Sequence, residues 1–460
     1  MMGMARGARL PIPGTGARPL NPGTDAASSA VATLPEPGWL HTSFVVLGIF
    51  SYSGARIVFG SSAVERDLGS SDPVYTAIQL LMLFGGLAVT YRHRQRCLLV
   101  LWRAWPFLLM LAVLALSALW SQSPMHTIRR CITVFVLLLY GVSTFAVFGP
   151  VRFMRLALRV LLLIALGSLA EAVLRPGIGY DVGDYANAIR GLYFQKNGLG
   201  MAMLSAALAL SFLVLNRGRF RWSDLAILGG LLVMLALSRS TTSTLLTMLT
   251  AGSTVLLVWL DRGGPWRWTS FLILGSSLSV AVLSFAVLGK EGVFDLLDKD
   301  PSLTGRTFIW EAAWMVFNQR PLLGHGYSAF WIAATPGVDV IWEHIQWDTP
   351  TAHSGYYEVL LQLGLLGAGL VVVLLLATLL RAGFCLFSER RRAAMWIMPF
   401  LLTMIILSNS ESVLLNPDLN TVYWIIGSLG LAGPVALRTA VAFRVRPGGV
   451  IVPPYHRQQL

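Results

Sequence analysis

A histidine stands at the mouth of a long apolar segment, in the stretch "TAHSGYYEVLLQLGLLGAGL" that begins at Thr351. The ordinary pKa of histidine lies close to neutrality, so His353 is a candidate general base. The alternative is a structural histidine satisfied at a membrane interface. Gly364 and Gly367 follow deeper in the run as Gly-x-x-Gly. Small residues at this spacing predict close packing of another helix, a supporting role for the glycines.

Four cations, Arg190, Lys196, Arg239 and Arg306, lie near the mouths of apolar segments. Arg306 opens an amphipathic segment, where the partial positive charge of a helix N-terminus disfavours a cation unless an anion also binds. Arg239 lies in a short turn between two apolar segments, and charges at membrane depth usually face a polar cavity. We predict that Arg306 and Arg190, then Arg239 and less strongly Lys196, bind a diphosphate. The alternatives are a solvated loop arginine for Arg306 and a snorkelling interfacial arginine for Arg239.

Two further polar residues have weaker assignments. Asn197 belongs to the same cationic stretch as Lys196, or it caps the apolar helix that follows. His325, in "GHG", is interpreted as loop architecture or as an acceptor contact. The histidines and the three cysteines show no metal-ligand spacing, so neither a metal nor a cofactor is predicted.

The composition indicates which elements must position these residues. Hydrophobic residues make up 55% of the 460 and charged residues 12%, whereas a soluble domain carries about 25% charged residues. Apolar runs of roughly 20 residues recur, so we predict an all-α polytopic membrane protein with about twelve transmembrane helices. The predicted spans are 39–59, 73–91, 104–120, 128–148, 155–173, 198–216, 222–238, 240–260, 269–288, 355–380, 393–409 and 419–438.

Arginines cluster in every second gap between these spans and near both chain ends. Positive residues stay on the cytoplasmic side of a membrane, so both termini are predicted to be cytoplasmic and the histidine periplasmic. The net charge of +13 is then a consequence of topology and of contact with anionic membrane lipids, and we predict no nucleic-acid partner.

Five regions follow from this topology. They are a disordered basic tail over 1–38, nine spans over 39–288, a periplasmic loop over 289–353, three spans over 354–440 and a tail over 441–460. Within the loop, Ile309, Ala312, Ala313, Val316 and Phe317 share one face of a predicted helix over 307–319. Its Trp and Phe content suits a helix at the membrane surface.

The stretch "GRTFIWEAAWMVFNQRPLLGHGYSAFW" followed by "HSGYYEVLLQLGLLG" resembles the O-antigen ligase and polysaccharide polymerase family of bacterial inner-membrane proteins. The family motif is a histidine, a small polar residue, nine others and Gly-x-x-Gly. His353, Ser354, residues 355–363, Gly364 and Gly367 match it. The long loop is most similar to the exopolysaccharide polymerase branch, and the resemblance covers roughly residues 186–415.

This resemblance implies a C-type glycosyltransferase architecture and a metal-independent, inverting transfer. The donor would be an oligosaccharide on undecaprenyl diphosphate, and the acceptor a second lipid-linked repeat unit in a polymerase or the lipid A core in a ligase. A co-polymerase or chain-length regulator is a further partner that this interpretation allows. His353 would be the base, and the arginines would stabilise the leaving diphosphate.

A transporter or flippase is the competing class. Transporters place ionisable residues near the midplane of the membrane, on broken helices in repeated halves. Here Glu171, Glu358 and Glu411 lie near the outer ends of spans, and no internal repeat is visible. The sequence therefore favours the enzyme.

Overall fold

The computed structural model describes residues 37–56, 73–182, 187–262, 306–332, 335–433, 444–445 and 451–452. The predicted ninth span, the loop up to residue 305 and most of both tails lie outside these ranges. The chain divides into two units. In the unit formed by Met1–Thr33 and Ala436–Leu460, β1 (Arg444–Val445) pairs antiparallel with β2 (Ile451–Val452).

The second unit, Leu34–Val435, contains the described helices. They are α1 (Trp39–Tyr52), α2 (Pro73–Arg92), α3 (Arg94–Arg103), α4 (Trp105–Leu116), η1 (Ser117–Leu119), α5 (Pro124–Leu174), α6 (Pro176–Gly179), α7 (Lys196–Arg217), α8 (Trp222–Ser238), α9 (Thr241–Asp261), α11 (Arg306–Phe317), α12 (Pro336–Ile345), α13 (Gly355–Cys385), α14 (Arg391–Leu407) and α15 (Leu419–Leu431). Helices occupy each predicted span that the structure describes. The basic gap after the second span is also helical, as α3.

Helix α5 joins two predicted spans that we had separated by a cytoplasmic gap. An unbroken helix of 51 residues would be roughly 75 Å long, more than twice the ~30 Å core of a bilayer. Gly149 breaks it with φ 70° and ψ 165°, and Pro150 follows. A proline removes a helical donor and glycine tolerates positive φ. The break therefore divides α5 into two segments, each long enough to cross a membrane.

Among the described residues, five helices are long and apolar enough to cross a membrane: α2, α5, α7, α9 and α13. The pair formed by α3 and residues 105–119, bent by 76°, would make a sixth. Helices α5 and α7 form the centre, with 83% of their most apolar windows buried, against 11% for α2. The exposed apolar side chains of α2 fit a surface that lipid covers.

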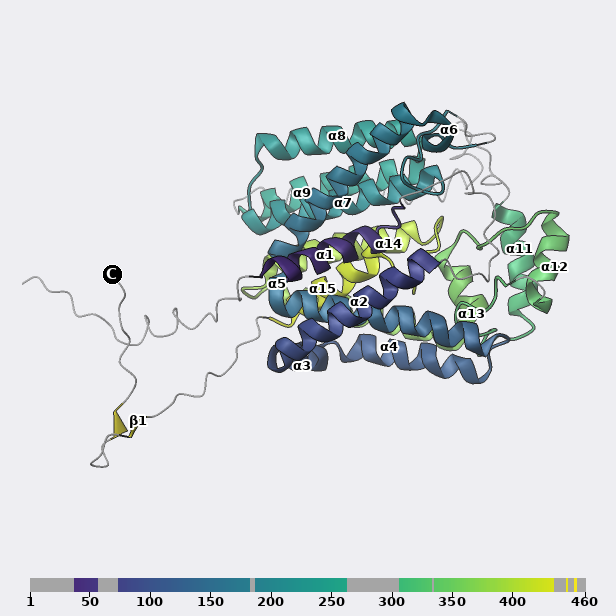
Figure 1. Ribbon diagram of the computed structural model, residues 1–460, viewed down its shortest axis with the longest axis horizontal. Helices are drawn as coiled ribbons and strands as arrows, with labels where there is room; N and C mark the ends of the chain where they lie inside the picture. The colour runs from purple at the N-terminus through teal and green to yellow at the C-terminus, as the bar shows by residue number, and fades with distance from the viewer. Residues whose placement is uncertain are drawn as a thin grey trace, which may run out of the picture. The chain divides into compact units, whose positions relative to one another are not determined.

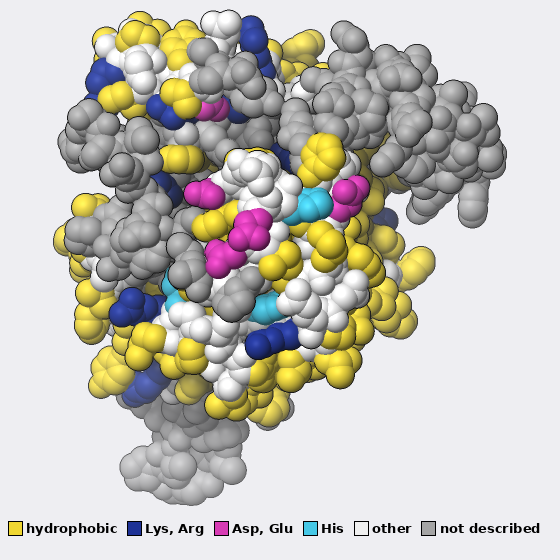
Figure 2. All heavy atoms as spheres, turned by 90° about the vertical axis from the view of Figure 1, so that its right-hand side faces the viewer, with side chains coloured by type: hydrophobic (Ala, Val, Ile, Leu, Met, Phe, Trp, Pro, Cys, Tyr) yellow, Lys and Arg dark blue, Asp and Glu magenta, His cyan; other side chains and the backbone are white. Residues whose placement is uncertain are grey.

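The core lies where α5, α7, α14 and α15 pack together. Its largest fully buried side chains include Trp396, Tyr140, Tyr423, Phe153 and Phe400. Helices α7, α8 and α9 lie side by side, and α11 and α12 pack together beside the start of α13 (Figure 1). Basic, acidic and histidine side chains gather on the end of the unit that carries α11 and α12, with apolar side chains at its flanks (Figure 2).

The predicted amphipathic helix is α11, and its five predicted apolar residues are all buried. They belong to a second core cluster with Phe330, Val338, Ile341 and Leu361. The apolar face thus packs on α12 and α13, and it is not the membrane that covers this face. The sequence predicted which face is apolar and not what covers it.

Candidate active site

Helix α13 is interrupted at Gly364, which has φ 61° and ψ −155°. In a regular helix the N–H groups of Leu365 and Leu366 would bond to the carbonyls of Leu361 and Gln362. Here they donate to Pro321 O at 2.8 Å and Leu322 O at 3.1 Å. The freed carbonyls of Leu361 and Gln362 accept from the N–H groups of His325 at 2.9 Å and Gly326 at 2.8 Å. Four bonds to the loop thus replace two bonds of the helix.

Two glycines make this insertion possible. A Cβ on Gly364 would lie 2.5 Å from the carbonyl carbon of Leu322, and one on Gly324 would lie 2.6 Å from that of Gln362. Both glycines have positive φ. A Cβ on Gly367 would meet the side chain of Leu363 at 2.2 Å. We had predicted a neighbouring helix as the partner of this Gly-x-x-Gly; the partner of Gly364 is instead a loop, and Gly367 makes room for its own helix.

His325 lies within this insertion. Its side chain is 4% exposed, its Nδ1 is 3.0 Å from Leu361 O, and its ring packs edge-on against Phe330. Burial lowers the pKa of His325, so the neutral form is favoured. These contacts give His325 a role in loop architecture, one of its two predicted assignments.

His353 lies on the connection that leads into α13, with φ 47°. Its backbone N–H donates to Thr351 Oγ1 at 3.3 Å. The N–H of Gly355 donates to Ser408 O at 2.8 Å and to Glu411 O at 3.1 Å, which ties the start of α13 to the end of α14. Burial, with a smaller contribution from the Arg306 guanidinium, lowers the pKa of His353 to about 4. The imidazole is therefore neutral at physiological pH and able to accept a proton.

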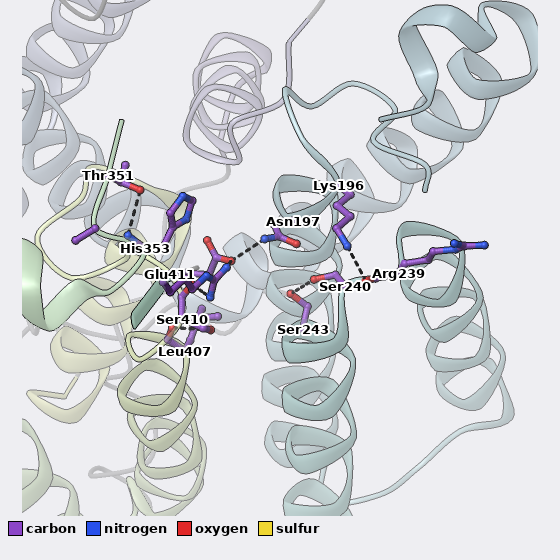
Figure 3. Close-up of polar contacts among 12 residues, drawn as sticks. Lys196, Asn197, Arg239, Ser240, Ser243, Thr351, His353, Leu407, Ser410 and Glu411 are labelled. Atoms are coloured by element: carbon purple, nitrogen blue, oxygen red, sulfur yellow. Dashed lines mark hydrogen bonds and ion pairs between the residues drawn. The ribbon is translucent and has the colours of Figure 1, made fainter. Parts of the chain in front are cut away.

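Arg306, the first described residue of α11, reaches the connection between α14 and α15. Its Nη1 donates to Ser410 O at 2.7 Å, and its Nη2 lies 3.6 Å from Glu411 Oε1. The same carboxylate oxygen accepts from Asn197 Nδ2 at 2.9 Å. Burial raises the pKa of Glu411, opposed by Arg306 and Asn197. This group, with His353, is the histidine cluster: Asn197, Arg306, His353, Ser410 and Glu411. Figure 3 labels each of them except Arg306.

Asn197 therefore does not cap α7, as one prediction had it. It is the second residue of the helix, and its amide donates across to Glu411. Lys196, one residue earlier, reaches the other way, because its Nζ donates to the backbone carbonyl of Arg239 at 3.4 Å. The Lys196 N–H donates to Asp181 Oδ2 at 2.9 Å. The first two residues of α7 thus contact two different polar regions.

Arg239 follows α8 with φ 50°. Its side chain is exposed and extends away from Lys196 and the histidine cluster (Figure 3). Arg190 is half-buried, and its Nε and Nη1 donate to Ile178 O at 2.8 Å and Phe194 O at 3.2 Å. Across the described ranges, no hydrogen bond or ion pair joins either arginine to Arg306 or His353. Arg306 therefore belongs to the histidine cluster, whereas Arg190 and Arg239 lie outside it.

The sequence did not single out the two buried carboxylates of this region as site residues. Glu411 orients Arg306 and Asn197. Glu358, in the first turn of α13, accepts from Trp331 Nε1 at 2.9 Å and from the Ala352 N–H at 2.7 Å. The sequence did contain a sign of both residues, because each is an acidic residue in an apolar context near a span mouth. Only the tertiary contacts show which groups each carboxylate binds. Within the described part of the chain, no three His, Cys, Asp or Glu side chains are grouped as metal ligands.

Comparison with known proteins identifies related sequences. Residues 225–372 match the O-antigen ligase family. Over 221 residues, the chain is 27% identical to the exopolysaccharide production protein ExoQ of Rhizobium meliloti. That alignment covers 46% of this chain and 51% of the relative, so the chain spans about half the length of the curated relative that it matches. The family match includes Arg239, Arg306, His353 and Gly364, and it confirms the resemblance found in the motif.

Proposed function

We propose, from the premise that this chain carries an O-antigen ligase family domain, that it is a membrane glycosyltransferase of polysaccharide assembly. It would join undecaprenyl-diphosphate-linked oligosaccharide repeat units into exopolysaccharide at the periplasmic face of the bacterial inner membrane. The observation that carries the proposal is His353, half-buried at the entry to α13, whose pKa is lowered by burial and then by the charge of Arg306, so that its imidazole is neutral.

His353 would act as the general base. The glycosyl acceptor is a sugar hydroxyl, which becomes a stronger nucleophile as its proton passes to the imidazole. The oxygen attacks the anomeric carbon, the bond to the lipid diphosphate breaks, and the configuration inverts. Burial lowers the pKa of His353 most, and the positive charge of Arg306 lowers it further. A diphosphate bound to Arg306 would offset that charge, so His353 would become a better base when the donor is in place.

Arg306 would be the principal diphosphate ligand. Its contacts to Ser410 and Glu411 leave further N–H donors on a guanidinium with five. The leaving group is already a good one, and a guanidinium can stabilise its charge without a metal. Arg190, Arg239 and Lys196 remain proposed contacts to the lipid diphosphate. Within the described residues, no hydrogen bond or ion pair joins Arg190 or Arg239 to Arg306, so these contacts would be secondary to that of Arg306.

The alternative function is O-antigen ligation, in which the acceptor is the lipid A core. The description of the matched family favours it, while the name of the relative favours exopolysaccharide production. The chemistry at His353 and Arg306 is the same in both, and the acceptor differs. The transporter interpretation is the least supported.

A deletion strain complemented with wild type, His353→Ala or Arg306→Ala tests the proposal. Lipid-linked oligosaccharides, secreted polysaccharide and lipopolysaccharide are extracted and sized. We expect single repeat units to accumulate on the lipid carrier and high-mass exopolysaccharide to disappear in both variants. Full-length chains on the carrier with lipopolysaccharide lacking its O-chain would instead establish the ligase. Three normal pools in both variants would reject the site.

A further inference from the structure

A cavity of about 150 Å³ opens beside the segment that carries His353. Ser410 and Glu411, which Arg306 contacts, do not line it. Its walls come from the start of α5, the loop after α11, the start of α13 and the connection between α14 and α15. Its volume is well below the roughly 300–1,000 Å³ of sites for drug-sized ligands. The cavity therefore has the size for one sugar ring and not for a whole repeat unit.

One wall carries a cation that pairs with no carboxylate among the described residues. Arg130, in the second turn of α5, is half-buried and lines the cavity. Across the described ranges, its guanidinium makes no hydrogen bond or ion pair. Partial burial of a charge is unfavourable unless a partner offsets it. An anion in the cavity would provide that partner through charge-assisted hydrogen bonds.

The carboxylate in the same cavity does not fill this role. Glu358 accepts from Trp331 Nε1, from the Ala352 N–H, from Gln362 Nε2 at 2.7 Å and from Ser412 Oγ at 3.4 Å. These donors hold the carboxylate in place and satisfy its negative charge. Among the described residues, Arg130 is therefore the charged group of this cavity that still lacks a partner. Its positive charge favours an anionic ligand.

The rest of the lining suits a sugar and places it near the proposed base. Ser328 and Asn416 bring a hydroxyl and an amide to the wall, groups that exchange hydrogen bonds with sugar hydroxyls. Thr351, also on the wall, accepts the backbone N–H of His353. A ring in the cavity would therefore lie beside the segment that carries the imidazole.

We propose that this cavity is a subsite for one ring of the acceptor glycan that bears an oxyanion, bound by Arg130. The oxyanion is a sugar carboxylate or a phosphate ester, since the two share the chemistry that a guanidinium recognises. The inference rests on the proposed function and adds a preference for acidic acceptors. Arg130 would be a specificity residue and takes no part in bond cleavage.

Binding is tested with the full chain in lipid nanodiscs, by saturation-transfer NMR titration. The probes are glucuronate, glucose 1-phosphate and glucose. We expect at least one anionic probe to bind about tenfold more tightly than glucose, as one charge-assisted contact would give. The two anionic probes identify which oxyanion is preferred. Arg130→Gln should remove the preference, and Arg130→Lys should keep part of it.

Arg129→Gln is the matched control, because Arg129 precedes Arg130 on α5 but is exposed and does not line the cavity. It should bind all three probes as wild type does. Equal binding of the three probes by wild type, an unchanged preference in Arg130→Gln, or an equal loss in Arg129→Gln would overturn the subsite. Binding is read without transfer, so this failure is separate from three normal glycan pools in the His353 and Arg306 variants, which would reject the proposed function itself.

Discussion

The first two residues of α7 contact two different polar regions. One region holds the guanidinium of Arg306, and the other holds the backbone carbonyl of Arg239. Asn197 contacts Glu411, the carboxylate beside the Arg306 guanidinium, whose side chain is 18% exposed. The Nζ of Lys196 contacts the backbone carbonyl of Arg239, and the guanidinium of that residue is exposed. One guanidinium is fixed by a buried acid and a carbonyl, and the other is left to solvent or lipid headgroups.

This difference shows that a cation near a span mouth is not sufficient evidence of a catalytic role. A fixed, partly buried donor is already oriented when charge develops, so it contributes more than a mobile one. An exposed charge is screened and contributes little. The comparison predicts large effects in the histidine cluster and small effects at Lys196 and Arg239.

The largest effect is expected from His353→Gln. Loss of a general base should reduce the transfer rate by about 10²- to 10⁴-fold. Lys196→Gln, in the other region, should reduce it by less than about threefold, since its contact is exposed. The rate is measured in membranes as conversion of lipid-linked oligosaccharide from the deletion strain into longer glycan. Equal losses in the two variants would contradict the comparison.

Arg306→Lys should follow, with a rate about 10²-fold lower, because lysine keeps the charge but loses the planar fork of donors. Arg239→Lys should stay close to wild type in the same assay, since the carbonyl that Lys196 contacts is retained. A strong loss in Arg239→Lys with an active Arg306→Lys would reverse the assignment of the two arginines.

Gly364→Ala should break the support of the histidine cluster. The added Cβ would meet the backbone of Leu322, and positive φ is strained for alanine, so we expect a loss of about 3 kcal/mol or more. Gly369→Ala in the same helix has nothing within 4 Å and should be neutral or slightly stabilising. Thermal unfolding in detergent compares the two variants; matching midpoints would show that the break tolerates a side chain.

Glu411→Gln should have a smaller effect, about tenfold on the rate. The amide can still accept from Asn197, but the ion pair that orients Arg306 is lost. Asp261→Asn is the control. Asp261 is the last residue of α9, and it pairs with Arg391 and Arg392 instead of with Arg306. Its substitution should leave the rate unchanged. A silent Glu411→Gln would mean that Ser410 alone orients the guanidinium.

The last prediction concerns pH. The unfolded chain protonates His353 near pH 6.5, whereas the folded chain does so only near pH 4. The unfolded state thus binds more protons between these values, and this contribution to stability falls as the pH drops from 6.5 to 4. The midpoint of thermal unfolding should fall further for wild type than for His353→Gln across this window. Parallel curves would indicate an ordinary pKa for His353.

The sequence predicted what local pattern determines. Apolar periodicity located the described helices that occupy the predicted spans and the buried face of α11 from Ile309 to Phe317. It could not predict that Arg306 meets Glu411, because that contact joins residues far apart in the chain. The Gly-x-x-Gly was misinterpreted for a physical reason: small residues permit close approach of any backbone, and only the fold shows that the backbone belongs to the loop at Leu322.

The break at Gly364 gives the family motif a geometrical meaning. The nine residues 355–363 form a helical segment about 13.5 Å long, at 1.5 Å and 100° per residue. The length of this segment fixes the distance and the rotation between His353 and the point where the loop enters. One inserted residue would turn the break by about 100° away from Leu322 and Gly324. This segment should therefore tolerate substitution of its side chains more easily than insertion or deletion of a residue.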